Sequence, residues 1–288
     1  MASDLESRET VRDLLLRLQS LFNSLRQTVA GDQGGVPTFY NVMARNVRLR
    51  LESLPPDAPW HERLEPFSRP LINSLIASAE RLESGRFVSW QDRVGTGLKK
   101  RDLGDLAISV SQGTTECMQW KGAPVFKTVY EFSIYPMILY EVRPATLIEL
   151  GSGTGSSAVW YSDLLKQYDN PAHVYSLDIK KPDLEYTGVT FIEADIFSID
   201  GLAGQFESLP RPWVVIEDAH VNVDGVLACM HKMLEKDDYL VIEDSSGKQS
   251  IINDFMQAHG NDYRIDTRYV DFFGMNVTSA MNSVFKRI

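Results

Sequence analysis

Short apolar, β-rich runs alternate with amphipathic helical segments from Val129 onward. Alternation at this spacing predicts a parallel sheet covered by helices on both faces, which is a doubly wound, Rossmann-like α/β fold. The predicted strands are Thr146–Leu150, Val174–Asp178, Thr190–Ile192, Trp213–Glu217 and Tyr239–Glu243. The predicted helices are Ser156–Gln167, Val223–Leu234 and Gln249–His259.

The end of the chain has a different pattern. Tyr263–Phe273 and Ser283–Ile288 are two strand-like runs joined through Gly274, and they predict an antiparallel edge that closes the sheet. Ligands of doubly wound sheets bind beyond the carboxyl ends of the parallel strands. We therefore expect the polar residues that follow each strand to gather on one rim of the sheet.

The N-terminal part of the chain has a helical pattern. Residues 4–29 predict one amphipathic helix, Gly31–Gly35 break the chain, and Pro70–Leu82 predict a further helix. The first helix either packs on its own domain or forms a subunit interface, since its stripe is similar to a short coiled-coil seam. We expect a helical lid or oligomerisation region over 1–125 and a cofactor-binding domain over 126–288. The apolar stripe comprises Val11, Leu14, Leu15, Leu18, Leu21, Phe22, Leu25 and Val29.

Composition narrows the classes of partner. The chain has 288 residues and a net charge of −10, which argues against nucleic acid or an anionic membrane surface and favours a small molecule. Its two cysteines, Cys117 and Cys229, provide neither a disulfide framework nor a cysteine zinc site. The sequence has no run of about 20 apolar residues and no secretory signal pattern, so we expect a cytoplasmic protein.

A glycine loop follows the first predicted parallel strand. Gly151, Gly153 and Gly155 alternate after Leu150, so the backbone can adopt positive φ angles and approach a ligand closely. The helix that follows presents unpaired N–H groups to that ligand. The spacing of the glycines departs from a dinucleotide-binding fingerprint. The acidic side chain of Glu149, next to the loop, is also better suited to a ligand of cationic character than to a pyrophosphate. These features favour S-adenosylmethionine.

Two more acidic residues follow the next two strands. Asp178 is suited to accept from both ribose hydroxyls, although it is alternatively a loop cap. Asp195 is suited to the adenine amino group, with Ile192 and Ile196 beside the ring, although it is alternatively an ordinary turn residue. The predicted cofactor-binding residues are Glu149, Gly151, Ser152, Gly153, Gly155, Asp178, Ile179, Asp195 and Ile196.

Further carboxylates end the last two parallel strands. Adjacent strands bring Asp218 beside Glu243 and Asp244, and three converging carboxylates repel one another unless a cation neutralises them. Oxygen ligands suit Mg²⁺, so we predict a magnesium site on Asp218, Glu243 and Asp244. The alternative is that some of these acids are solvated strand ends or helix caps, and it is strongest for Glu217 and Asp244.

The series from Glu149 to Asp195 resembles the motifs of class I S-adenosylmethionine-dependent methyltransferases over residues 129 to 288. Four short segments also resemble the cephalosporin hydroxylase branch and related sugar and macrolide O-methyltransferases. They are Trp120 to Lys127, Arg143 to Gly151, Glu217 to His220, and Val241 to Asp244. The resemblance implies a cofactor pocket paired with Mg²⁺ on Asp218, Glu243 and Asp244.

His220 is the candidate general base, because an imidazole of ordinary pKa can deprotonate a hydroxyl near neutral pH. Alternatively it is a metal ligand or only a hydrogen-bonding partner of one. Lys127 and Tyr130 are interpreted as a surface lysine and a core tyrosine, with contact to substrate or cofactor as the alternative.

These features predict a Mg²⁺-dependent O-methyltransferase of secondary metabolism that acts on a small hydroxylated acceptor, with the N-terminal region closing over the pocket. A second hypothesis is an enzyme of the same fold that catalyses a hydroxylation or isomerisation. A third is a non-enzymatic nucleotide-binding or scaffold protein.

Overall fold

The computed structural model describes residues 16–17, 20, 85–95 and 97–288. The chain divides into two compact units, Met1–Gly85 and Arg86–Ile288. Of the helix predicted over residues 4–29, the structure describes only residues 16, 17 and 20, which are helical, and Pro70–Leu82 lies outside the described residues. Residues 86–125 belong to the same compact unit as the sheet, whereas the sequence-based division lies at residue 125.

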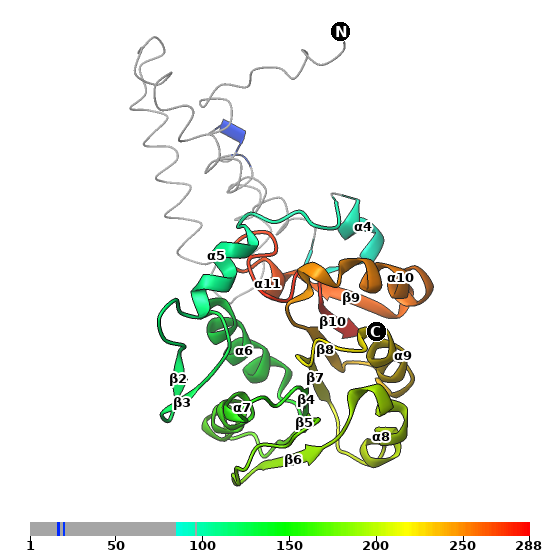
Figure 1. The fold of residues 1–288 in the computed structure, drawn as a ribbon. Helices are drawn as coiled ribbons and strands as arrows, with labels where there is room; N and C mark the ends of the chain where they lie inside the picture. Colours follow the sequence, from blue (N-terminus) through cyan, green and yellow to red (C-terminus); the bar gives the residue numbers. More distant parts are fainter. Residues whose placement is uncertain (1–15, 18–19, 21–84, 96) are drawn as a thin grey trace. The chain divides into compact units, whose positions relative to one another are not determined.

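An eight-stranded sheet with the order β1-β9-β10-β8-β7-β4-β5-β6 forms the core of the second unit (Figure 1). Strands β8, β7, β4, β5 and β6 are parallel, and β10, β9 and β1 continue the sheet in antiparallel pairs. The prediction of a doubly wound, mostly parallel sheet with an antiparallel C-terminal edge is confirmed. The strands are β1 (Phe87–Val88), β4 (Thr146–Leu150), β5 (His173–Asp178), β6 (Val189–Glu193), β7 (Trp213–Glu217), β8 (Tyr239–Ile242), β9 (Tyr263–Asp266) and β10 (Val284–Arg287).

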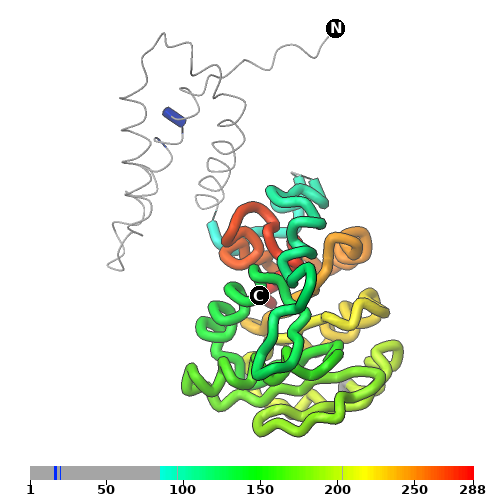
Figure 2. Tube along the Cα trace, turned by 60° about the vertical axis from the view of Figure 1, so that its left-hand side comes forward, coloured from blue at the N-terminus to red at the C-terminus, as the bar shows by residue number. Residues whose placement is uncertain are grey.

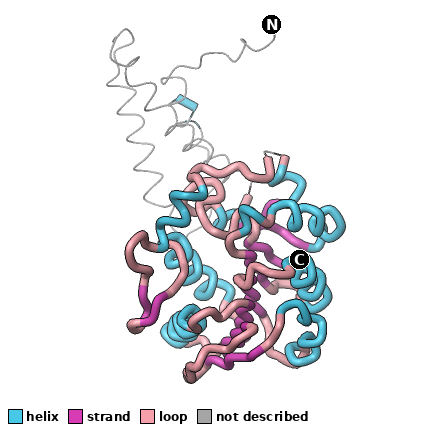
Figure 3. Tube along the Cα trace, in the orientation of Figure 1, coloured by secondary structure: helices cyan, strands magenta, loops and turns pink. Residues whose placement is uncertain are grey.

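Helices cover both faces of the sheet (Figure 3). Helices α6 (Val129–Val142) and α7 (Ser156–Gln167) lie on one face, and α8 (Ile199–Phe206), α9 (Val223–Met233) and α10 (Gln249–His259) lie on the other. Every residue of β4 and β7 is therefore buried, which explains why both strands are mostly apolar. Within the described part of the chain, no helix combines the length and apolar character needed to cross a membrane.

Two elements differ from the sequence pattern. Helix α8 was not predicted, because Gly201 and Gly204 within it weaken the helical signal. Strand β9 ends at Asp266 instead of continuing to Phe273, because the Asp266 side chain accepts a hydrogen bond from the backbone N–H of Arg268 and caps the short helix α11 (Thr267–Val270).

The segment that precedes the hairpin β2 (Gln119–Trp120) and β3 (Ala123–Pro124) lies beside the irregular loop that leads to β10 (Figure 2). Arg93, on α4 (Trp90–Val94), is buried and forms two hydrogen bonds of 2.7 Å to the carboxylate of Asp271. It also donates to the side chains of Asn276 and Asn282. This buried network attaches the start of the unit to its end.

Replacing Arg93 with Met is expected to lower the free energy of unfolding by about 3–5 kcal/mol, since the change removes one partner of a buried ion pair with Asp271. Urea denaturation measures this. Arg268→Met is the matched control, because Arg268 is half exposed where it pairs with Glu141 and is expected to contribute about 1 kcal/mol or less. Equal losses in the two variants would contradict the stabilising role assigned to the buried Arg93 network.

Candidate active site

The glycine loop lies where the ends of β4 and β7 approach each other. Gly151 has a φ of +107°, and a Cβ placed on it would lie 2.6 Å from the carbonyl carbon and oxygen of Asp218. Gly155, with a φ of +81°, comes immediately before α7, and a Cβ there would lie 2.9 Å from the ring of Phe191. At both positions a side chain would therefore clash as well as strain the backbone.

A cavity of about 510 Å³ opens beside this loop, at the carboxyl ends of the parallel strands. Most of the predicted cofactor-binding residues line it, whereas Glu149 and Gly155 are not among its lining residues. The lining residues are Gln112, Phe126, Lys127, Gly151, Ser152, Gly153, Thr154, Ser156, Ser157, Asp178, Ile179, Asp195, Ile196, Phe197, Asp218, Ala219, His220, Val221 and Asp244.

Two predicted cofactor carboxylates organise the wall of the cavity. Asp178 Oδ2 accepts a 2.9 Å hydrogen bond from the backbone N–H of Gly153, so this carboxylate shapes the glycine loop. Asp195 Oδ1 accepts from the N–H of Phe197 and caps the 3-10 turn η2 (Ile196–Ser198). Both carboxylates keep acceptor positions beyond these bonds. Ile179, which is 71% exposed, contributes an apolar surface to the same cavity.

Glu149 is completely buried behind the loop. Its Oε2 accepts a 2.5 Å hydrogen bond from Ser176, whose hydroxyl is also 2.7 Å from that of Ser152. Its Oε1 has no hydrogen-bond partner among the described residues. Burial raises the pKa of Glu149 from 4.5 to about 7, although nearby Lys127 lowers it. The hydroxyl groups of Ser157 and Ser176 also lower this pKa, since they donate to the ionised carboxylate.

Lys127 is buried, contrary to the prediction of a surface lysine. Its Nζ donates to Asp218 Oδ2 at 2.5 Å and to Glu243 Oε2 at 2.7 Å. Burial by itself lowers the pKa of Lys127, but the two carboxylates raise it well above its usual value. The other oxygen of Glu243 accepts a hydrogen bond from Tyr135. Glu243 is therefore turned into the protein interior, and burial and Asp218 raise its pKa.

Lys248 forms a second cationic centre at this rim. Its ammonium group donates to Glu217 Oε2 at 2.6 Å and to the carbonyl oxygen of Glu243 at 2.7 Å. It also lies 3.0 Å from Nδ1 of His220. An ammonium group has only donors, so Nδ1 of His220 accepts and the proton of the neutral ring is on Nε2.

Asp218, His220 and Asp244 come together at the mouth of the cavity. Nε2 of His220 lies 3.4 Å from Asp218 Oδ1 and 3.4 Å from Asp244 Oδ2. One ligand atom from each of these residues falls within 4.8 Å of the other two, a group that does not include Glu243. His220 and Asp244 both adopt positive φ angles, of 61° and 44°, which turn their side chains out of regular structure.

Sequence reasoning missed several residues of this site. Lys127 lay within a quoted motif, but its burial depends on contacts with the ends of β7 and β8, far along the chain. Lys248 had no motif. Phe126 and Phe197, which line the cavity and are more than half exposed, follow no regular spacing that would single them out.

The raised pKa of Glu149 predicts a specific pH dependence of stability. Between pH 4.5 and about 7 the folded protein retains a proton on Glu149 that the unfolded chain loses. The contribution of Glu149 to the free energy of unfolding is therefore fully present below 4.5 and is lost as the pH rises through about 7. Urea denaturation of the wild type and Glu149→Gln across this range should show the wild type losing stability relative to the variant. Parallel pH profiles would refute this prediction.

Solved structures with a similar fold include a CmcI structure with Mg and S-adenosylmethionine. It is 25% identical, with a TM-score of 0.50, over 59% of this chain and 76% of that chain. A CmcI structure with S-adenosylhomocysteine is 22% identical, with a TM-score of 0.51, over 68% of this chain and 91% of that chain, and it supports the fold alone.

Curated relatives include the rhamnosyl O-methyltransferases of two mycobacteria. The protein of Mycobacterium leprae is 32% identical over 138 residues, which are 44% of this chain and 60% of that relative. The protein of Mycobacterium bovis is 29% identical over 193 residues, which are 58% of this chain and 77% of that relative.

A family model described as Rhamnosyl O-methyltransferase/CmcI matches residues 112–267, which include the glycine loop, the carboxylates of the rim and most of the sheet. The chain therefore belongs to the Rhamnosyl O-methyltransferase/CmcI family, a branch of the class I S-adenosylmethionine-dependent methyltransferases.

Proposed function

We propose that this protein transfers the methyl group of S-adenosylmethionine to a hydroxyl oxygen of a small, sugar-like or natural-product acceptor, with the help of Mg²⁺. The main support is that one cavity contains both the glycine loop with Asp178 and the carboxylates of Asp218 and Asp244. The rhamnosyl O-methyltransferases among the relatives support a sugar hydroxyl as acceptor.

The residues on the glycine-loop side of the cavity fit the cofactor. Asp178 would accept from the ribose hydroxyls with the acceptor positions that Gly153 leaves open. Ile179 and Ile196 provide apolar surface for the adenine ring, and Asp195 lies beside them. The buried carboxylate of Glu149 behind the loop favours a cationic ligand nearby over a pyrophosphate.

The donor set at the mouth of the cavity fits Mg²⁺. Asp218 Oδ1 and Asp244 Oδ2 are hard oxygen ligands near the solvent, and Mg²⁺ in proteins is commonly held by one or two carboxylates together with water. Glu243, the third ligand predicted from the sequence, would join them only if it left Lys127 and Tyr135. In this proposal Asp218 and Asp244 hold the ion, and Glu243 positions Asp218 through Lys127.

The chain itself contributes mainly alignment, because methyl transfer from a sulfonium needs no covalent help from the protein. The ion, when bound, would lower the pKa of the acceptor hydroxyl. Lys248 holds the His220 ring with its Nε2–H directed at Asp218 and Asp244. His220 would serve as the base at Nε2 only after passing that proton to one of these carboxylates. The lid role of the N-terminal region remains a prediction.

Substitutions of single acidic residues should distinguish cofactor binding from metal-dependent methyl transfer. Asp178→Ala is expected to weaken S-adenosylmethionine binding by about tenfold or more, which corresponds to about 1.4 kcal/mol. Asp218→Asn is expected to leave that affinity within about threefold while abolishing Mg²⁺-dependent methyl transfer. Calorimetry and transfer of a labelled methyl group to a rhamnosyl acceptor measure the two effects.

Asp254→Asn, on the exposed face of α10, is the matched control and should behave as the wild type. Full activity of Asp218→Asn in the presence of a chelator would refute the metal part of the proposal. A converted acceptor that carries no label would support the alternative of a non-methylating reaction on the same fold.

Lys127→Met should make the protein depend on a divalent cation. The change leaves Asp218 and Glu243 facing each other without the buried ammonium group, which is strongly destabilising in the absence of another cation. Added Mg²⁺ should therefore raise the melting temperature of Lys127→Met by more than it raises that of the wild type. Lys121→Met, which removes an exposed lysine paired with Asp163, is the control. Equal effects of Mg²⁺ on all three proteins would contradict the role assigned to Lys127.

A further inference from the structure

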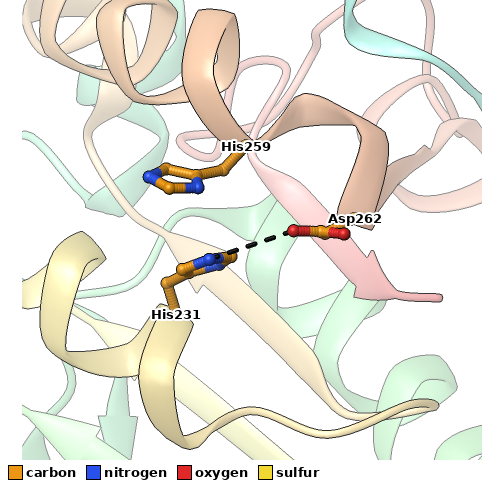
Figure 4. A group of neighbouring side chains, drawn as sticks. All are labelled: His231, His259 and Asp262. Carbon is orange, nitrogen blue, oxygen red and sulfur yellow. Dashed lines mark ion pairs between the residues drawn. The ribbon is translucent and has the colours of Figure 1, made fainter.

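Two histidines and a carboxylate meet at the end of the sheet opposite the cavity (Figure 4). His231 lies in the last turn of α9, His259 is the last residue of α10, and Asp262 belongs to the 3-10 turn η4 (Gly260–Asp262). Both helices start near the carboxyl ends of parallel strands and run back toward the opposite rim. None of the three residues lines the cavity, so this cluster is separate from the candidate active site.

The three side chains are close enough to share one ion. The imidazole rings of His231 and His259 have centroids 4.0 Å apart, and Nε2 of His231 lies 3.9 Å from Asp262 Oδ2. One ligand atom from each residue lies within 4.8 Å of the other two. All three residues are partly exposed, so an ion from solvent can reach them.

The Nδ1 atom of His231, on the side of the ring away from Asp262, has two polar neighbours. It lies 3.1 Å from the hydroxyl of the buried Tyr263 and 3.1 Å from Nη1 of Arg287. A guanidinium has only donors, so beside Arg287 Nδ1 accepts and the proton of the neutral ring is on Nε2. Metal binding at Nε2 therefore requires Arg287 to move away and the proton to be on Nδ1, where the tyrosine hydroxyl can accept a hydrogen bond from it. A hydrogen bond of this kind orients the histidine ligand of many metal sites.

The electrostatics of the cluster contain one favourable and one opposing contribution. The C-terminal ends of α9 and α10 meet here, and helix C-termini favour positive charge. Against this, Arg287 lies 3.3 Å from Asp262 and competes with any ion for that carboxylate.

We propose that His231, His259 and Asp262 form a second metal site, which takes a transition-metal ion such as Zn²⁺. Two imidazoles and one carboxylate are a zinc donor set, whereas Mg²⁺ prefers oxygen ligands. Zinc–ligand bonds of about 2.0–2.2 Å in a tetrahedral arrangement need ligand atoms about 3.3–3.6 Å apart, so the side chains, whose ligand atoms lie within 4.8 Å of one another, must move closer together. A water molecule completes the coordination. The ion joins α9, α10 and η4 and competes with Arg287 for Asp262.

Zinc titration of the full chain tests this site. The protein is first freed of metal with a chelator and then saturated with Mg²⁺ and S-adenosylmethionine, so that the cavity is occupied. Calorimetry with ZnCl2 should show a binding event that His259→Ala weakens by about tenfold or more, together with a zinc-dependent rise in melting temperature that this variant loses. His173→Ala, which alters a histidine on β5 paired with Thr190, is the matched control.

Two further variants identify where zinc binds. Asp218→Asn should keep the event, because it alters only the cavity, and His259→Ala should keep the methyl-transfer activity of the wild type. Arg287→Gln should bind zinc several-fold more tightly, because it removes the competing positive charge.

Co²⁺ bound to the wild type should give the visible absorption of a tetrahedral complex, which His259→Ala should lack. Equal zinc binding by the wild type and His259→Ala, or unchanged or weaker binding by Arg287→Gln, would overturn the proposal.

Discussion

The charge balance at the ends of β7 and β8 is the constraint on which the site depends. Two pairs of consecutive acidic residues lie at this rim, Glu217 with Asp218 and Glu243 with Asp244. Two largely buried lysine ammonium groups lie among them. Lys127 joins Asp218 to Glu243, while Lys248 joins Glu217 to the backbone and to His220. Buried carboxylates without such partners would have to be neutralised by protons.

Pairing with the two lysines separates the acidic residues into those that are held in the interior and those that face the cavity. The side chains that the lysines hold in the interior shape the rim, whereas Asp244 and one oxygen of Asp218 remain at the mouth of the cavity. The close approach of Gly151 to the backbone of Asp218 brings the cofactor loop and the carboxylates into one cavity. The proposed ion and the proposed methyl donor are therefore neighbours because two parallel strands, β4 and β7, are paired.

Local pattern predicted most of the second unit. The bounds of β4, β7 and α7 agree with the predicted segments. A mostly apolar strand and a helix that begins after a glycine loop are both patterns of neighbouring residues, so the sequence shows them directly. Helix α8 was missed because its packing outweighs the weak helix propensity of its two glycines. The long strand predicted after Tyr263 was wrong because one capping side chain, Asp266, stops it.

The sequence by itself determined the fold class, the position of the glycine loop and which carboxylates reach the rim, since strand ends and turn residues are properties of neighbouring positions. Only the tertiary structure decided which of those carboxylates face the cavity and which pair with Lys127, because that pairing joins residues 91 and 116 positions apart. The cluster of His231, His259 and Asp262 arose in the same way, from two helices that end side by side. Spacing along the chain records local geometry, whereas burial and charge pairing are set by long-range packing.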